Sequence, residues 1–231
     1  MIAILTRPDA IVFDLDGTLA DTFSLMADGF AVALEPRLGR RVTYTEVTEK
    51  FIGGGTERQI LDEFVGYEDP EALQRYLAFY ADQHHTVTLF PGIADALAAC
   101  AATHLPLGLM TGKGRATAEI TLAKLGIRHY FDVVITGDEA TRPKPDPMGP
   151  LLALAALGIA PERSLFIGDT RADVRAGQVA GMHTIVVGWN NRHEAEETVA
   201  LYHPDAAFYD SIEFSAWLRT LLGAQDTAST S

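Results

Sequence analysis

Short apolar runs, separated by polar and turn-forming residues, recur along this chain of 231 residues. Five of them are brief and bounded by Gly, Pro, Asp or Thr, which indicates buried strands. These runs lie at residues 10–13, 105–110, 131–135, 164–167 and 184–187. Helical patterns lie between the later runs; Ala116, Ile120, Ala123 and Ile127, for example, recur at helical spacing. Alternating strands and helices predict an α/β fold with a Rossmann-like parallel sheet covered on both faces.

The stretch between the first two runs is much longer than a crossover between parallel strands requires. Its apolar residues fall in helical stripes, such as Phe23, Met26, Phe30 and Leu34. We therefore expect an inserted α-helical cap domain at 20–89. The α/β core domain would then be formed by residues 1–19 together with 90–231.

Acidic residues outnumber basic ones by 31 to 18, which gives a formal net charge of -13. This balance argues against nucleic acid or an anionic membrane as the main partner, although a metal and a few lysines can still attract an anionic substrate. The chain has one cysteine, Cys100, so a disulfide framework within it is excluded. We expect no signal peptide and no membrane-spanning segment, and hence a cytoplasmic monomer or homodimer.

Distinctive polar residues follow each of the first four predicted strands. In chain order they are Asp14 and Asp16, then Thr111, Gly112 and Lys113, then Lys144, and finally Asp169. The carboxyl ends of parallel strands share one edge of the sheet, where ligands bind. We therefore expect these residues to meet at a single site.

The residue types in this set suit the hydrolysis of a phosphate ester. Asp14 could act as a nucleophile, and Asp14 with Asp169 could ligate Mg²⁺, which prefers oxygen ligands. Asp16 faces the same side of an extended segment as Asp14 and could act as general acid and base. The hydroxyl of Thr111, the amide of Gly112 at a helix start and the charge of Lys144 all suit a phosphoryl group. Lys113 either belongs to this turn or is a plain charge at the start of a helix.

Four segments together resemble the haloacid dehalogenase superfamily. The first is Asp14-Leu15-Asp16-Gly17-Thr18-Leu19 followed by Asp21 and Thr22, and the second is Thr111-Gly112-Lys113. The third is Lys144 between two prolines, and the fourth is Gly168-Asp169 with Asp173. Their order makes the combination specific, although Gly112 replaces the Asn that many relatives carry. The helical insert and the segments 51–56 and 90–93 look most like phosphoglycolate phosphatases.

The resemblance implies a phosphatase that works through a phospho-aspartate on Asp14. It implies Mg²⁺ held by the Asp14 carboxylate, the Asp16 main-chain carbonyl and Asp169. Asp173 would act through a metal-bound water, unless it is merely a surface residue. Thr111, Gly112 and Lys144 would hold the phosphoryl group.

The inserted helices would decide which leaving group is accepted. The resemblance places the glycine run that contains Gly54 over the active site. Thr56 and Arg58 are candidates for substrate contact, and Arg58 could pair bidentately with a substrate carboxylate. In the alternative interpretation Thr56 caps a helix and Arg58 is a solvated charge. Lys50, the only lysine of the insert, is a further possible contact.

We expect the substrate to be a small phosphorylated metabolite, such as a phosphoglycolate-like phosphomonoester. A phosphomutase, a phosphonate hydrolase and a pyrophosphatase of the same superfamily remain open. A different class of function, a catalytically silent regulatory or binding protein, would need none of the set that includes Asp14, Asp16, Lys144 and Asp169.

Overall fold

The computed structural model describes residues 7–52 and 55–223, without the side chains of residues 51 and 52. Its centre is one parallel sheet of six strands in the order β3-β2-β1-β4-β5-β6. The strands are β1 (Ala10–Phe13), β2 (Leu107–Met110), β3 (Val133–Ile135), β4 (Ser164–Gly168), β5 (His183–Val187) and β6 (Ala206–Phe208). This sheet confirms the predicted α/β fold class.

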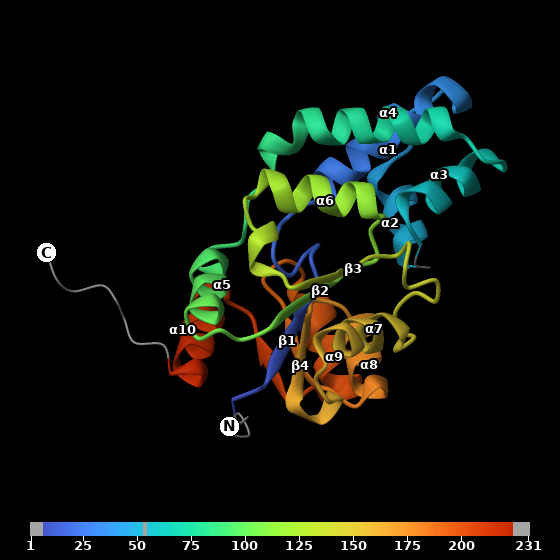
Figure 1. Ribbon diagram of the computed structural model, residues 1–231. Helices are drawn as coiled ribbons and strands as arrows, with labels where there is room; N and C mark the ends of the chain where they lie inside the picture. The colour runs from blue at the N-terminus through green and yellow to red at the C-terminus, as the bar shows by residue number, and fades with distance from the viewer. Residues whose placement is uncertain (1–6, 53–54, 224–231) are drawn as a thin grey trace, which may run out of the picture.

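Helices cover both faces of the sheet (Figure 1). Helices α5 (Ile93–Ala102) and α10 (Ser211–Leu222) pack together on one face, and α7 (Met148–Leu157), α8 (Arg171–Ala180) and α9 (Arg192–Tyr202) cover the other. Alternate residues of β1 serve the two layers, because successive strand side chains point to opposite faces. Ile11 and Phe13 pack with α5 and α10, whereas Val12 packs with α7 and its neighbours. Three short 3-10 helices lie at His84–Thr86, Arg128–Tyr130 and Pro161–Arg163.

Four helices between β1 and α5 form a separate apolar cluster above the sheet (Figure 1). We call them the cap helices: α1 (Phe23–Leu38), α2 (Tyr44–Ile52), α3 (Glu57–Val65) and α4 (Pro70–Gln83). Phe30, Leu61, Tyr76 and Tyr80 are among the buried residues of this cluster. Because the cluster has a core of its own, the cap helices pack on one another as well as on the rest of the chain.

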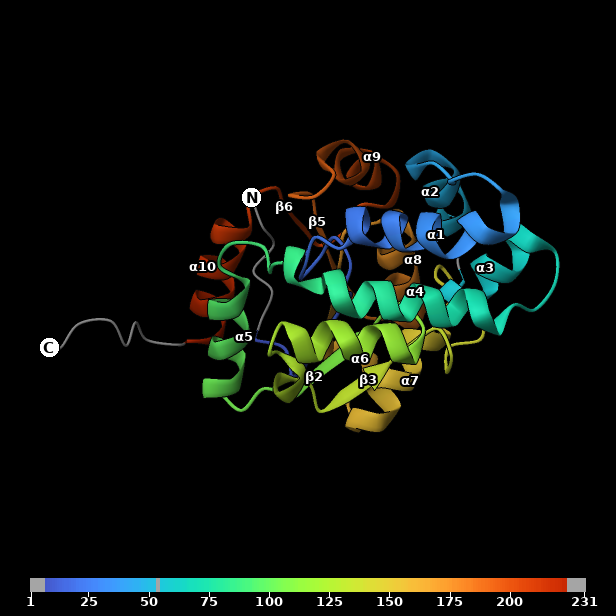
Figure 2. The ribbon, with the colours of Figure 1, turned by 90° about the horizontal axis from the view of Figure 1, so that it is seen from above.

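Helix α6 (Arg115–Lys124) runs beside α4 and joins the cap helices to the sheet (Figure 2). The stripe predicted for this segment is confirmed only in part: Ile127 is buried and Ile120 half-buried, but Ala116 and Ala123 are exposed. The buried face instead contains Thr117, Ala118, Thr121 and Leu122. Thr121 tolerates burial because its hydroxyl bonds to the Tyr80 hydroxyl at 2.9 Å and to His84 Nε2 at 3.2 Å.

Strand β6 was not among the predicted strands. Its three residues add to the edge of the sheet through the pair Ile185↔Ala206. Two of its three residues are alanines and Asp205 precedes them, so the segment does not stand out as an apolar block. In the ranges described here, no helix has the length and apolar character needed to span a bilayer.

Candidate active site

Three acidic side chains gather at the carboxyl edge of the sheet. Asp14 follows β1, Asp169 follows β4 and Asp173 lies in the first turn of α8, where its carboxylate and Thr170 form a capping box. All three are buried, and one carboxylate oxygen from each lies within 4.8 Å of the other two. Gly17 leaves room for this arrangement, because a Cβ there would lie 2.1 Å from Asp169 Oδ2.

Lys144 brings a positive charge into the acidic cluster from the loop between β3 and α7. Its Nζ lies 2.7 Å from Asp14 Oδ1 and 2.6 Å from Asp173 Oδ1. One ammonium therefore bridges two of the three carboxylates. The structure thus joins residues that are 130 positions apart in the sequence, Asp14 and Lys144.

The cluster carries more negative charge than Lys144 balances. Burial raises the pKa of Asp14 to about 7; Lys144 opposes the rise, whereas Asp173 and Asp16 add to it. Burial, and then the charges of Asp173 and Asp14, raise the pKa of Asp169 well above its ordinary value. Three buried carboxylates are the oxygen donors that a hard divalent cation prefers. A divalent metal ion therefore fits this cluster in both ligand type and charge.

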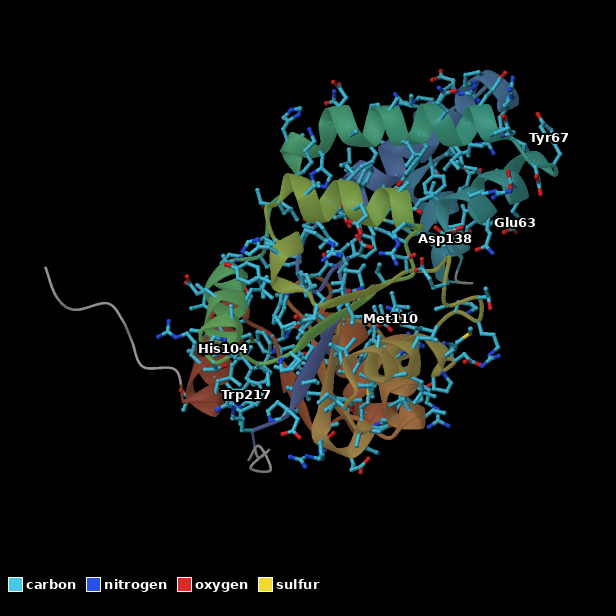
Figure 3. The ribbon with its side chains drawn as sticks, viewed as in Figure 1. Glu63, Tyr67, His104, Met110, Asp138 and Trp217 are labelled. Atoms are coloured by element: carbon cyan, nitrogen blue, oxygen red, sulfur yellow. The ribbon has the colours of Figure 1, made fainter. Side chains whose placement is uncertain are left out.

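A tight turn after β2 faces the same space as Lys144. The buried hydroxyl of Thr111 accepts a hydrogen bond from the Lys113 amide at 3.2 Å. Next to it, Gly112 and Lys144 line a cavity of about 220 Å³, whose walls also include Gly55 and Gln59 next to and within α3. Figure 3 shows Met110, another lining residue, close to the sheet, and Asp138 nearer to the cap helices. Among the lining residues within the described ranges, Lys144 alone is charged.

The Asp16 side chain lies outside the three-carboxylate group and faces different partners. Thr22 donates a short hydrogen bond to Asp16 Oδ1, and Lys113 Nζ lies 3.4 Å from the same oxygen. Lys113 is buried, so it is not the solvated helix-start charge of one interpretation. Burial alone would lower the pKa of Lys113, but Asp16, Tyr80 and Glu57 together raise it above its ordinary value. The ammonium therefore remains charged inside the protein.

This geometry agrees with what comparisons with known proteins find. The model of the haloacid dehalogenase-like hydrolase family matches residues 11–187. The chain belongs to this family. It is 31% identical over 219 residues to a phosphoglycolate phosphatase of Nitrosococcus oceani, covering 91% of this chain and 96% of the relative. It is 32% identical over 212 residues to the pyrophosphatase PpaX of Bacillus velezensis, covering 86% and 91%.

The fold of this hydrolase is also similar to a solved structure, CbbY from Rhodobacter sphaeroides in complex with phosphate. That similarity has a TM-score of 0.77 at 26% sequence identity and covers 90% of this chain and 96% of the other. The predicted family is thereby confirmed, together with the predicted enzyme class, a hydrolase of the phosphatase type.

The residues of the insert that were predicted to contact the substrate do not gather at the site as the residues predicted at the sheet edge do. Thr56 is buried and caps α3 through Gln59, as its alternative interpretation predicted. The structure does not bring Arg58 to the site: its side chain is 60% exposed and lies 3.5 Å from Glu68 and 3.9 Å from Asp62. Arg58 points away because it follows the buried first residue of α3 by one position. The predicted contact at Gly54 lies outside the described residues.

The Lys50 side chain also lies away from the cavity. Its ammonium makes an ion pair with Glu63, which Figure 3 shows on the outward side of α3. Neither Lys50 nor Arg58 lines the cavity beside Lys144.

One site residue was missed by sequence reasoning. Glu57, the first residue of α3, is 1% exposed, and its Oε2 accepts a hydrogen bond from the Gly114 amide at 2.8 Å. Its Oε1 lies 3.5 Å from Lys113 Nζ. An acidic residue in the first turn of a helix is ordinary, because it interacts favourably with the helix dipole. Nothing in the sequence therefore distinguishes Glu57 from other residues of this kind.

Proposed function

We propose that this hydrolase is a Mg²⁺-dependent phosphatase that transfers the phosphoryl group of a small phosphomonoester to Asp14 and then to water. One observation carries the proposal: the buried Asp14 carboxylate contacts Lys144 and lies within the group formed with Asp169 and Asp173. A carboxylate held in this way is an oriented nucleophile beside charges that can stabilise a phosphoryl group.

The proposed reaction has two steps. In the first, a carboxylate oxygen of Asp14 attacks phosphorus, the bond between phosphorus and the ester oxygen breaks, and that oxygen takes a proton from Asp16. In the second, water attacks phosphorus and gives a proton to Asp16. The bond between phosphorus and the Asp14 oxygen breaks, so that phosphate is released and the Asp14 carboxylate is regenerated. Lys144 and the turn at Thr111 and Gly112 would hold the phosphoryl oxygens in both steps.

The metal would be held by Asp14, Asp169 and Asp173, with the Asp16 main-chain carbonyl that the family resemblance implies. Bound there, Mg²⁺ would neutralise charge on the phosphoryl oxygens and the carboxylates. The chain itself contributes Lys144 for the same purpose, and it holds Asp173 in place through the capping box with Thr170.

The cavity supports a small substrate with one phosphate. Its volume of about 220 Å³ leaves room for a short leaving group, and its walls, as far as they are described, offer Lys144 as the charged side chain. A phosphomutase must hold a second phosphate, but Lys50 and Arg58 are paired with acidic residues instead. We therefore favour a phosphoglycolate-like phosphomonoester, with residues 20–89 acting as the cap. Pyrophosphate is the second candidate, supported by the similarity to the Bacillus velezensis relative.

A phosphate-release screen tests this proposal. Wild type and Asp14→Asn would be assayed with phosphoglycolate, pyrophosphate, a nucleoside monophosphate and a sugar phosphate, in Mg²⁺ and in EDTA. We expect wild type to turn over at least one compound in Mg²⁺ alone, and Asp14→Asn to be inactive. No release from any compound in Mg²⁺, or full activity of Asp14→Asn, would contradict the proposal.

A further inference from the structure

A single buried ammonium joins the cap helices to the Asp16 carboxylate. Lys113 enters from the turn after β2, and its side chain is 1% exposed. Its Nζ lies 3.4 Å from Asp16 Oδ1 on one side and 3.5 Å from Glu57 Oε1 on the other. Lys113 is therefore shared between a carboxylate that follows β1 and a carboxylate on α3.

The same Glu57 side chain also holds the backbone beside Lys113. Its second oxygen accepts the Gly114 amide at 2.8 Å, and Gly114 is the residue that precedes α6. The amides at the start of a helix have no partner within the helix, so this carboxylate satisfies one of them from outside. Glu57 thus constrains both the side chain of Lys113 and the peptide that follows it.

The contact depends on a very close approach of two segments, 55–57 and 112–114. A Cβ at Gly114 would lie 3.1 Å from Glu57 Oε2. A Cβ at Gly137 would lie 2.4 Å from the Gly112 carbonyl oxygen and 2.8 Å from Thr56 Cγ2. The start of α3 therefore lies in close contact with the turn after β2 at Gly114, and Gly137 fits tightly against both segments, whereas the cavity stays open beside Gly112. Glu57 can reach Lys113 only when it is docked.

The aromatic ring of Tyr80 closes a further side of the lysine. Lys113 Nζ lies 4.9 Å from the centre of this ring, at a distance suited to a cation–π contact. The Tyr80 hydroxyl is itself held by Thr121 of α6. The place of this buried ammonium is decided by its two carboxylate neighbours, and removal of Glu57 leaves Asp16 as the one carboxylate that still pairs with it.

We propose that Glu57 is a positioning residue for hydrolysis: it fixes Lys113, and through Lys113 it holds the Asp16 carboxyl where the leaving oxygen takes its proton. The inference rests on the proposed function, in which Asp16 is the general acid. It adds that this acid is correctly placed only when α3 is docked, so leaving-group protonation depends on docking of the cap helices.

Two substrates separate this role from a merely structural one. An alkyl phosphate such as phosphoglycolate needs a proton on its departing oxygen, whereas p-nitrophenolate departs without one. The value of kcat/KM reports the first step for both. We expect Glu57→Gln to lower kcat/KM about 10²-fold for the alkyl phosphate and less than about 3-fold for p-nitrophenyl phosphate. Glu63→Gln, the same change at an exposed position of α3, should alter neither value.

A second variant keeps the test decisive if Glu57→Gln folds poorly. The double variant Glu57→Gln with Lys113→Met removes both members of the Glu57–Lys113 pair, so neither is left buried without the other. It should fold and still hydrolyse the alkyl phosphate slowly, with p-nitrophenyl phosphate much less affected. Wild-type rates on the alkyl phosphate in the double variant, or equal losses on both substrates, would overturn the role of Glu57. A wild type inactive in Mg²⁺ on p-nitrophenyl phosphate and on every compound of the phosphate-release screen would instead overturn the proposed function, and this inference with it.

Discussion

Lys144 Nζ lies 2.7 Å from Asp14 Oδ1, although 130 residues separate the two along the chain. The ammonium reaches Asp14 because β1 and β3 end at the same edge of the sheet. A charge fixed at this distance from the nucleophile should act on the phosphoryl oxygens without having to reorganise.

Removal of this charge should therefore lower turnover strongly, because the phosphoryl oxygens lose a fixed partner. We expect Lys144→Met to lower kcat/KM by about 10²- to 10³-fold, the usual loss for one preorganised partner of a developing charge. Arg142→Met is the matched control, because Arg142 lies two residues earlier and its exposed side chain pairs with Asp146. Steady-state kinetics of both variants would check the prediction, and equal losses in the two would contradict it.

Gly17 offers a test of the acidic cluster that changes no charge. Its φ is +78°, and an added Cβ would lie 2.1 Å from Asp169 Oδ2. Gly17→Ala should displace Asp169 and reduce activity more than about 10²-fold, the scale lost when a catalytic group is misplaced by about 1 Å. Gly39→Ala is the control, since Gly39 has φ +66° with no atom within 4 Å of an added Cβ. It should cost about 1 kcal/mol of stability and leave activity intact. Comparable activity in the two variants would count against the role given to Asp169.

The raised pKa of Asp14 predicts how the metal-free protein responds to pH. Its pKa is about 7 in the folded protein, against 3.8 for an ordinary aspartate in the unfolded chain, so the folded state holds the proton to higher pH. The resulting stability is fully present below the lower value and is lost as pH rises through the higher one. Relative to Asp14→Asn, wild type in EDTA should lose on the order of 2 kcal/mol between about pH 5.5 and about pH 8.

Urea unfolding of both proteins at the two pH values measures this difference. Saturating Mg²⁺ should remove the loss, because a cation bound to the carboxylates favours the ionised form of Asp14 and so lowers its pKa. A wild-type free energy of unfolding that changes with pH in the same way as that of Asp14→Asn would contradict the raised pKa of Asp14.

Arg58 should be dispensable for turnover. Its side chain is 60% exposed and pairs with Glu68 and Asp62, and it does not line the cavity. We expect Arg58→Ala to keep kcat and KM within about 2-fold of wild type on acidic substrates, as is usual when an exposed ion pair is removed. A KM for phosphoglycolate raised tenfold or more, with KM for an uncharged alkyl phosphate unchanged, would return Arg58 to the site.

The core of the fold could be predicted because its signals are local. Each of the strands β1 to β5 is a short apolar run, and each of the first four is followed by the polar residue that the chemistry uses. Strand β6, with the sequence Ala-Ala-Phe, is too weakly apolar to stand out, whereas the equally short β3 lies within the longer run at 131–135. The buried face of α6 was misjudged because Thr117 and Thr121 read as polar, and the partners that allow the burial of Thr121 lie about 40 residues away at Tyr80 and His84.

The part of the site that the cap helices contribute is harder to predict, because its residues are identified only by contacts between segments that are far apart in the sequence. Asp14, Asp16 and Asp169 are recognised by their place after strands, a position fixed by the parallel sheet. Glu57 has no such context, and only its distances to Lys113 and Gly114 distinguish it from the exposed Glu63 of the same helix.

Trapping of the phosphorylated enzyme tests the central claim most directly. Wild type would be quenched in acid during turnover of its best phosphomonoester, digested, and analysed by peptide mass spectrometry, with Asp14→Asn in parallel. We expect a phosphate on the peptide that contains Asp14, sensitive to hydroxylamine as acyl phosphates are, and none in Asp14→Asn. Active wild-type enzyme that carries no phosphate on Asp14 at any quench time, together with an Asp14→Asn variant that still turns over, would contradict the account.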